Sequence, residues 1–153
     1  MGSAAPGEMQ MKSIKQLLGN PPRAPISVAP GDTVVHALRV MAERDIGAVV
    51  VMEENKLIGI FSERDYARKV VLKGKNSTDT RVGDIMTEKV IYVSPDLKVD
   101  EVMALMTEKH IRHVPVLDSQ KNVLTMISIG DLVKETISEQ AFQIQQLEQY
   151  IAG

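Results

Sequence analysis

The stretch Ile111-Arg-His-Val-Pro-Val-Leu117 decides the fold of this chain. It is a short apolar run that begins with two basic side chains, and runs of this kind are typical of buried strands. An earlier stretch, Ile46-Gly-Ala-Val-Val-Val-Met52, has the same length and a similar β-branched character. The sequence therefore indicates two copies of one unit.

The residues around these two strands also repeat at an almost constant spacing. Pro95 follows Pro30 at an offset of 65, and one residue inserted in the turn at 118–122 changes the offset to 66. The apolar positions of a predicted helix correspond in the two copies: Val34, Ala37, Leu38 and Met41 in the first, and Val99, Val102, Met103 and Met106 in the second. A repeat of this length indicates a tandem duplication.

Each copy has the order strand, helix, strand, strand, helix, which predicts an α/β (α+β) fold with helices that cover small sheets. Neither copy is long enough to bury a large core alone. We therefore expect two tandem β-α-β-β-α repeats packed as a pseudo-twofold pair, with a C-terminal helix. Strands are expected at 26–28, 46–52 and 57–61, and helices at 11–18, from 62 to about 73, and at 82–86.

Turn-forming and polar residues divide the chain into five segments. These are a flexible tail at 1–10, a first repeat with its N-terminal helix at 11–73, a linker at 74–89, a second repeat at 90–137, and a C-terminal helix at 138–153. A turn at 30–33 precedes the first long helix, which we expect Asp32 or Thr33 to cap.

The C-terminal helix carries one continuous apolar stripe. Its members recur every three or four residues, as on a single helical face: Ile137, Ala141, Ile144, Leu147 and Ile151. The stripe either packs on its own domain or is covered by a partner chain, because a large apolar patch is rarely left in water without a binding role. A closed pair of identical subunits would cover it, and we expect a homodimer.

Composition excludes several kinds of partner. The chain has no Cys, which excludes disulfides and Cys-ligated zinc. A net charge of -2 provides no basic field for nucleic acid, and an aromatic content of 3% leaves few rings for base stacking. No apolar run approaches the roughly 18 residues of a membrane span. We expect a cytoplasmic protein that binds neither nucleic acid nor a membrane.

No catalytic or metal-ligating pattern stands out. The three histidines, His36, His110 and His113, do not have the spacing of a zinc site. A Gly-x-Ser-x-Gly elbow, a Walker A loop and a Gly-x-Gly-x-x-Gly loop are all absent from the sequence. We therefore expect no metal site and no enzymatic activity.

Two Ser-x-x-Asp motifs, at 62–65 and 128–131, stand where a strand is expected to become a helix. In one interpretation each motif is a capping box, in which the serine and the acidic side chain satisfy free amides. In the other, the helix N-terminus suits a phosphate and the aspartate accepts hydrogen bonds from ribose hydroxyls. Because duplication copies a cap as readily as a binding site, the motifs alone leave both interpretations open.

The two copies differ at the entrance to the buried strand. Arg112 and His113 stand there in the second copy, and Gly47 and Ala48 in the first. The basic pair is either a surface feature or a phosphate site, since arginine offers a planar fork of donors. The small residues allow a flat base to approach the backbone closely. The copies thus provide complementary parts of one possible site.

Together these residues resemble a known family. The stretches Gly59-Ile-Phe-Ser-Glu-Arg-Asp65, Asp84-Ile-Met-Thr87, Arg112-His-Val-Pro-Val116 and Ile127-Ser-Ile-Gly-Asp131 resemble a tandem pair of CBS (cystathionine-β-synthase) domains, or Bateman module. The resemblance covers about residues 12–137 and is greatest to the small stand-alone bacterial members. It implies clefts between the repeats that hold adenine nucleotides such as AMP, ADP, ATP or NAD(H), and a dimer of four repeats.

The resemblance also implies roles for individual residues. In one cleft Asp131 would bind ribose and Ser128, Arg112 and His113 would lie at the phosphate, with the adenine flanked by Ser27, Ile46, Gly47 and Ala48. In the other cleft Asp65 would bind ribose and Ser62 and Arg64 would lie near phosphate, with Tyr92, Ile111, Arg112, His113 and Pro115 around the base. Thr125 stands where the first copy has Gly59, which would crowd one cleft.

CBS pairs usually regulate an attached enzyme or channel, and no such domain is evident in these 153 residues. The expected function is therefore non-catalytic sensing of an adenine nucleotide, with AMP or NAD(H) as ligand and an unidentified regulated protein as partner. One alternative is a structural dimerisation module without a ligand response. An enzyme that acts on a nucleotide is the less favoured alternative.

Overall fold

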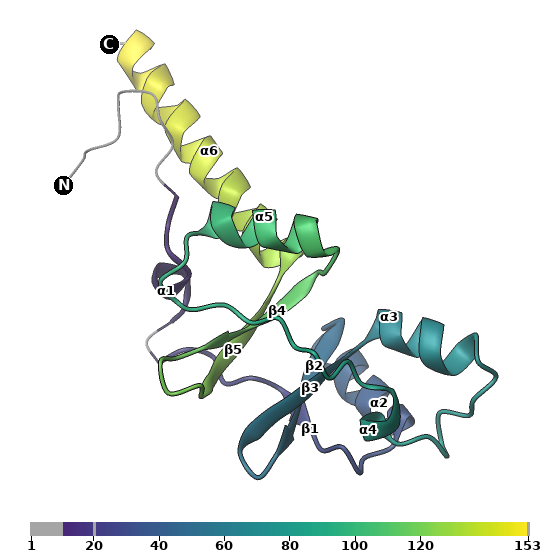
Figure 1. The fold of residues 1–153 in the computed structure, drawn as a ribbon. Helices are drawn as coiled ribbons and strands as arrows, with labels where there is room; N and C mark the ends of the chain where they lie inside the picture. Colours follow the sequence, from purple (N-terminus) through teal and green to yellow (C-terminus); the bar gives the residue numbers. More distant parts are fainter. Residues whose placement is uncertain (1–10, 20, 153) are drawn as a thin grey trace.

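The computed structural model describes residues 11–19 and 21–152. Figure 1 shows two small α/β halves and one long helix that extends away from the second half. The tail predicted at 1–10 lies outside the described residues.

The first half contains a three-stranded sheet of β1 (Ser27–Val28), β2 (Ala48–Glu53) and β3 (Lys56–Ser62). β1 runs parallel to the central strand β2, and β2 pairs antiparallel with β3. Helix α2 (Val34–Arg44) connects β1 to β2. β3 leads into α3 (Glu63–Asp65), which continues as the π-helix η1 (Tyr66–Val71). The predicted order of elements is confirmed, with α and π turns in place of one α-helix.

The second half repeats this order with its first strand reduced to a single bridge, between Val93 and Val116. Helix α5 (Val99–Lys109) precedes the hairpin of β4 (His113–Leu117) and β5 (Val123–Ser128), and α6 (Ile129–Ala152) follows it. The register agrees between the copies, because Ala48 pairs with Ser62 just as His113 pairs with Ser128. The structure thus contains the two repeats that the sequence predicts.

Equivalent residues end the two central helices. Asp45 (φ 53°) ends α2 and His110 (φ 56°) ends α5, both in the left-handed conformation, which is a common way to stop a helix. The amides of Ile46 and Ile111 then donate back to the helices that they leave. β2 and β4 therefore begin two residues later than predicted. The dipeptides Ile46-Gly47 and Ile111-Arg112 lie directly before them, at the strand entrances.

The cap of α2 is formed by Thr33, one of the two candidates from the sequence. Its hydroxyl oxygen accepts a hydrogen bond from the amide of His36 at 3.2 Å. The carboxylate of Asp32 instead accepts from the amide of Ala29 at 2.9 Å and so stabilises the preceding turn.

Each half has its own apolar core, and each core includes a segment from outside its repeat. α1 (Ile14–Leu17) belongs to the segment of the first repeat, yet Ile14 is fully buried in the second core beside residues such as Val99. Its amide donates to the carbonyl of Leu97 at 2.8 Å. Conversely, α4 (Val82–Ile85), in the predicted linker, buries its apolar side chains in the first core. The exchanged segments hold the two halves together.

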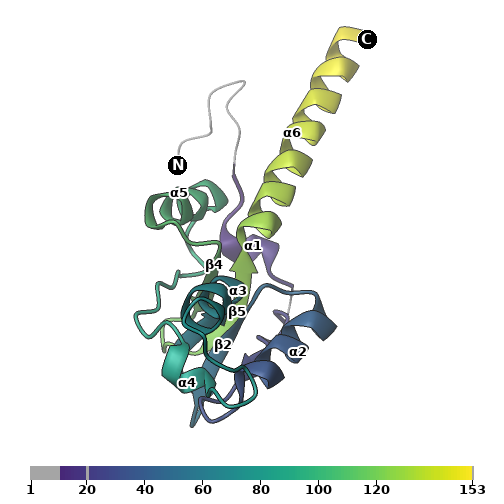
Figure 2. The same ribbon diagram turned by 90° about the vertical axis from the view of Figure 1, so that its right-hand side faces the viewer.

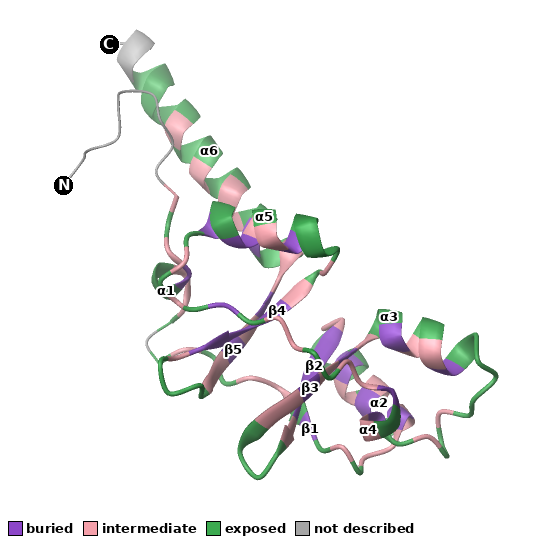
Figure 3. Cartoon of the chain, viewed as in Figure 1, coloured by how far each residue is buried: buried purple, intermediate pink, exposed green. Residues whose placement is uncertain are grey.

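α6 is a single helix that leaves the second half after its first turns (Figure 2). Leu132 near its start is fully buried, but the stripe residues Ile137, Ile144 and Leu147 are 60%, 56% and 63% exposed (Figure 3). Ala141 is exposed as well, and the side chain of Ile151 is not described. Within one chain the described members of the stripe, 137–147, therefore cover no core. No helix of the described residues, α6 included, is long and apolar enough to cross a membrane.

Gly59 in β3 leaves no room for a side chain. A Cβ there would lie 2.6 Å from Sδ of Met86 and 3.0 Å from the carbonyl oxygen of Thr87, which accepts a hydrogen bond from Ile60 and cannot easily move. We expect Gly59→Ala to lower the free energy of unfolding by about 1–3 kcal/mol, as overpacking does, in urea denaturation. Gly31→Ala is the control, because its Cβ would meet nothing within 4 Å. Equal effects of the two substitutions would contradict the prediction.

Candidate functional site

Two clefts lie where the halves meet. One lies at the junction of β3 with α3, and the other lies at the junction of β5 with α6. The Asp65 cleft, of about 1080 Å³, is lined by the start of α3, the end of α5 and the entrance to β4. The Asp131 cleft, of about 690 Å³, is lined by the start of α6 and the entrance to β2. Gly47 and His113 line both clefts and form the boundary between them.

Six of the eight residues predicted for one site line the Asp65 cleft: Ser62, Arg64, Asp65, Ile111, Arg112 and His113. The other two do not. Tyr92 is 46% exposed and does not line the cleft. Pro115 is buried within β4.

Six of the eight residues predicted for the other site line the Asp131 cleft: Ile46, Gly47, Ala48, His113, Ser128 and Asp131. Ser27 is exposed in β1 and is not part of this lining, and Arg112 lines only the Asp65 cleft. Thr125 lines the Asp131 cleft, whereas its counterpart Gly59 lines neither. The additional side chain is thus present at one cleft only.

The structure adds charged residues that were not predicted from the sequence. They are Glu63, Arg68, Lys69 and Lys89 at the Asp65 cleft, and Arg23, Arg44, Asp45, Lys134 and Glu135 at the Asp131 cleft. Lys69 and Glu135 each follow an aspartate of the motif by four residues, a spacing that places two side chains on one helical face. That signal was available in the sequence. Arg23 and Lys89 reach the clefts only through the tertiary fold.

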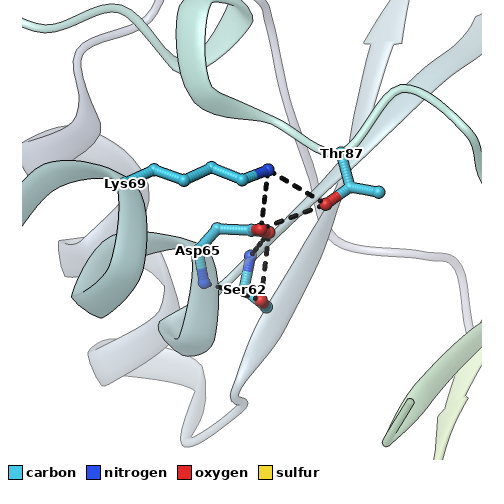
Figure 4. A network of polar contacts seen from close by, with 4 residues as sticks. All are labelled: Ser62, Asp65, Lys69 and Thr87. Atoms are coloured by element: carbon cyan, nitrogen blue, oxygen red, sulfur yellow. Dashed lines mark hydrogen bonds and ion pairs between the residues drawn. The ribbon is translucent and has the colours of Figure 1, made fainter. Parts of the chain in front are cut away.

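Asp65 is a buried carboxylate with four donors around it (Figure 4). Its Oδ2 accepts from the amide and the hydroxyl of Ser62, both at 3.0 Å. Its Oδ1 accepts from the hydroxyl of Thr87 at 3.0 Å and lies 3.1 Å from Nζ of Lys69. The amide of Asp65 donates back to Oγ of Ser62 at 3.1 Å, which completes a capping box.

Asp131 forms the equivalent pair with Ser128 but is otherwise open. Its Oδ2 accepts from the amide of Ser128 at 2.9 Å, and its own amide donates to the Ser128 hydroxyl at 3.1 Å. The residue is exposed, and no donor in the described part of the chain bonds to Oδ1. This oxygen can therefore accept a hydrogen bond from a bound molecule.

His113 packs against Gly47 at the boundary of the clefts. A Cβ on Gly47 would lie 3.3 Å from Cε1 of His113, which is close contact. Burial lowers the pKa of His113 from its usual value of 6.5, while Asp131 and Glu63 act to raise it and Arg112 acts to lower it. The imidazole is therefore neutral at pH 7, and an anion bound beside it would favour the protonated form.

Arg64 bridges the two halves across the Asp65 cleft. One guanidinium nitrogen, Nη1, donates to the carbonyl oxygen of His110 at 2.8 Å. This bond joins the start of the helix after β3 to the end of α5, and it leaves the remaining donors of the guanidinium available.

The described residues, 11–19 and 21–152, contain no group of three His, Asp or Glu side chains that could hold a metal ion. In the same residues every buried side-chain nitrogen or oxygen has a hydrogen-bond partner. The chemical features of the clefts are thus their exposed charges and the open Oδ1 of Asp131.

Comparison with sequence families gives a match to the CBS domain at residues 14–72 and 82–138. The CBS domain-containing protein CBSX3, mitochondrial, of Arabidopsis thaliana is 45% identical over 127 residues, which are 80% of this chain and 61% of that protein. Protein MK0525 of Methanopyrus kandleri is 36% identical over 110 residues, 71% of this chain and 56% of that protein. The chain therefore spans less than two thirds of these two relatives.

Solved structures agree with this match. A protein with CBS domains from Burkholderia ambifaria, assigned to signal transduction, is 48% identical with a TM-score of 0.77, covering 83% of this chain and 93% of that one. The CBS-domain protein ATU1752 of Agrobacterium tumefaciens is 34% identical with a TM-score of 0.75, covering 80% and 98%. The CBS pair of protein MJ0100, solved with 5′-methylthioadenosine and S-adenosyl-L-methionine, shares the fold at 24% identity and a TM-score of 0.75, covering 85% and 99%. This chain belongs to the CBS-domain family and carries two CBS domains in tandem.

Proposed function

We propose that this protein is a non-catalytic sensor that binds an adenine nucleotide, such as AMP, ATP or NAD(H), between its two CBS domains and signals to a regulated protein. The observation that carries the proposal is the Asp131 carboxylate, which is exposed at a cleft and has an Oδ1 without a donor among the described residues. A carboxylate in this position is suited to accept hydrogen bonds from ribose hydroxyls.

The remaining lining of the Asp131 cleft suits the other parts of a nucleotide. Ile46, Gly47 and Ala48 line one side of the cleft with small and apolar residues, of which Ala48 is fully buried. A flat base can lie against the surface of Ile46 and Gly47. Ser128 stands beside Asp131 at the start of α6, where an anion is favoured by the helix dipole. The volume of about 690 Å³ is within the range of small-molecule sites, roughly 300–1,000 Å³.

The MJ0100 pair was solved with two adenosine compounds. At 24% identity, the similarity of that pair to this chain supports a shared fold only. From composition and motifs we also propose a cytoplasmic location and the absence of catalysis. The relative CBSX3, which is 45% identical, is named as a mitochondrial protein.

A second candidate function, a dimerisation module without a ligand response, is favoured by the exposed stripe on α6. The two functions differ in thermal denaturation with AMP, ATP and NADH. A ligand at 100 times its dissociation constant should add about 2.7 kcal/mol to the free energy of unfolding. We expect such a stabilisation with at least one adenine nucleotide, and no stabilisation with any of them would favour the dimerisation module.

Asp131→Ala should weaken nucleotide binding more than it weakens folding. Loss of a helix cap costs about 1 kcal/mol of stability, and loss of a ribose contact should reduce the affinity for AMP by at least about tenfold, or about 1.4 kcal/mol. Titration calorimetry with AMP and urea denaturation measure the two effects separately.

Thr33→Ala is the matched control for Asp131→Ala. Thr33 also caps a helix, accepting from the amide of His36 at 3.2 Å, and it lines neither cleft. It should reduce stability by a similar amount and leave AMP affinity unchanged. Wild-type affinity in the Asp131→Ala protein would rule out the ribose contact.

We also propose that the protein is a homodimer in which α6 forms or adjoins the interface. The exposed apolar side chains of the stripe are better covered by the same patch of a second copy than by water. Ile144→Glu combined with Leu147→Glu should convert the dimer into a monomer in light scattering, with AMP binding retained in weakened form.

Gln145→Glu combined with Gln149→Glu is the control for the dimer. It adds two negative charges to the same helix outside the stripe, at exposed positions, and should leave the dimer intact. A wild-type protein that is monomeric at tens of micromolar, the range of ordinary micromolar association, would contradict the proposal.

A further inference from the structure

We propose that the Asp65 cleft is an anion site for a polyphosphate group, and that it does not repeat the nucleoside site of the Asp131 cleft. This inference rests on the proposed function for the nucleoside part, but its own evidence comes from the Asp65 cleft. Internal symmetry predicts the same ribose contact from both aspartates. The two carboxylates differ, however, because donors engage both oxygens of Asp65 but only Oδ2 of Asp131.

The Asp65 carboxylate has no free position for a ribose. An ionised carboxylate has about four lone-pair sites, and here four donors occupy them: two from Ser62, one from Thr87 and one from Lys69. The Asp65 side chain is also only 10% exposed. A sugar hydroxyl would therefore have to displace an existing donor before it could bond to this aspartate.

Two of these donors have no counterpart in the second repeat. At the offset of 66, Lys69 corresponds to Glu135, which is itself paired with Lys12 at 3.1 Å. At the offset of 65, Thr87 corresponds to Pro22, which has no side-chain donor. Both copies therefore have the capping box, but only in the first copy do additional donors occupy the second oxygen of the aspartate.

The Asp65 cleft also has a larger surplus of positive charge than the Asp131 cleft. The Asp65 cleft is lined by five cationic side chains, Arg64, Arg68, Lys69, Lys89 and Arg112, and by two carboxylates. The Asp131 cleft is lined by three cationic side chains and three carboxylates. A surplus of positive charge attracts a ligand with several negative charges and contributes little to the binding of a neutral nucleoside.

The cationic groups come from both halves and so surround the space between them. Arg64 is held at the cleft by its bond to the carbonyl of His110, and Arg112 enters from the opposite half before β4. Guanidinium groups bind phosphate oxygens through two parallel hydrogen bonds. The volume of about 1080 Å³ admits a chain of several phosphates.

The proposal is tested by calorimetric titration of the whole protein with adenosine and with inorganic tripolyphosphate. Wild type should bind one adenosine per chain and should bind tripolyphosphate at a separate site, with an affinity that falls as salt is raised. Arg64→Gln combined with Arg112→Gln should reduce the affinity for tripolyphosphate at least about tenfold, as expected for hydrogen bonds to charged groups, and spare adenosine. Asp131→Asn should do the reverse.

Arg23→Gln combined with Arg44→Gln is the matched control, because it removes the same charge from the Asp131 cleft. It should leave tripolyphosphate affinity within about threefold of wild type, the scatter typical of such effects. If the Arg64 and Arg112 double variant does not fold, as judged by its melting curve, Arg68→Gln with Lys89→Gln replaces it, since both residues are exposed at the same cleft.

Competition with ATP identifies the source of the polyphosphate. Displacement of tripolyphosphate by ATP assigns the site to the phosphates of a nucleotide, and simultaneous binding assigns it to a free polyphosphate; both support an anion site. Two adenosines per chain, equal losses in the two arginine double variants, or no binding of tripolyphosphate would overturn the inference. Tripolyphosphate binding without binding of adenosine or any adenine nucleotide would instead overturn the proposed nucleotide sensor alone.

Discussion

The structure depends on one constraint: neither CBS repeat completes its core with residues of its own. Ile14, at the start of the first CBS match, is buried in the second core, and Val82, at the start of the second match, is buried in the first. The halves are therefore held in a fixed relation by apolar side chains, which are the strongest contribution to folding. Because the exchanged segments tie the halves together, the strand entrances of one half face the helix starts of the other, and the two clefts form there.

The repeated elements could be predicted because their signals are local. Helix periodicity, the β-branched strands and the cap at Thr33 each depend on residues close together in sequence. The composition of the clefts was predicted less fully, since it depends on where separate segments meet. Arg112 was assigned to both sites but lines one, and Tyr92 was placed in a site that it does not line. Lys69 and Glu135 are the exceptions, because each follows a motif aspartate by four residues and this spacing is local.

The two interpretations of the Ser-x-x-Asp motif are compatible in the structure. At Asp131 the capping box uses Oδ2, and Oδ1 remains open toward the cleft. One carboxylate can thus stabilise a helix start and still present an acceptor to solvent. At Asp65 the same box is present, but Thr87 and Lys69 engage the second oxygen. The surroundings of the motif, rather than the motif itself, decide what each copy can bind.

The continuity of α6 has a mechanical consequence. The helix begins at Ile129, beside the Ser128–Asp131 box, and continues without interruption to Ala152. At 1.5 Å per residue its 24 residues form a rod of about 36 Å. A rigid rod that is tilted by about 5° at its base moves at its far end by about 3 Å, which follows from this length. A tilt of α6 at its base, which lies against the Asp131 cleft, would therefore displace the far end of the helix more than the base.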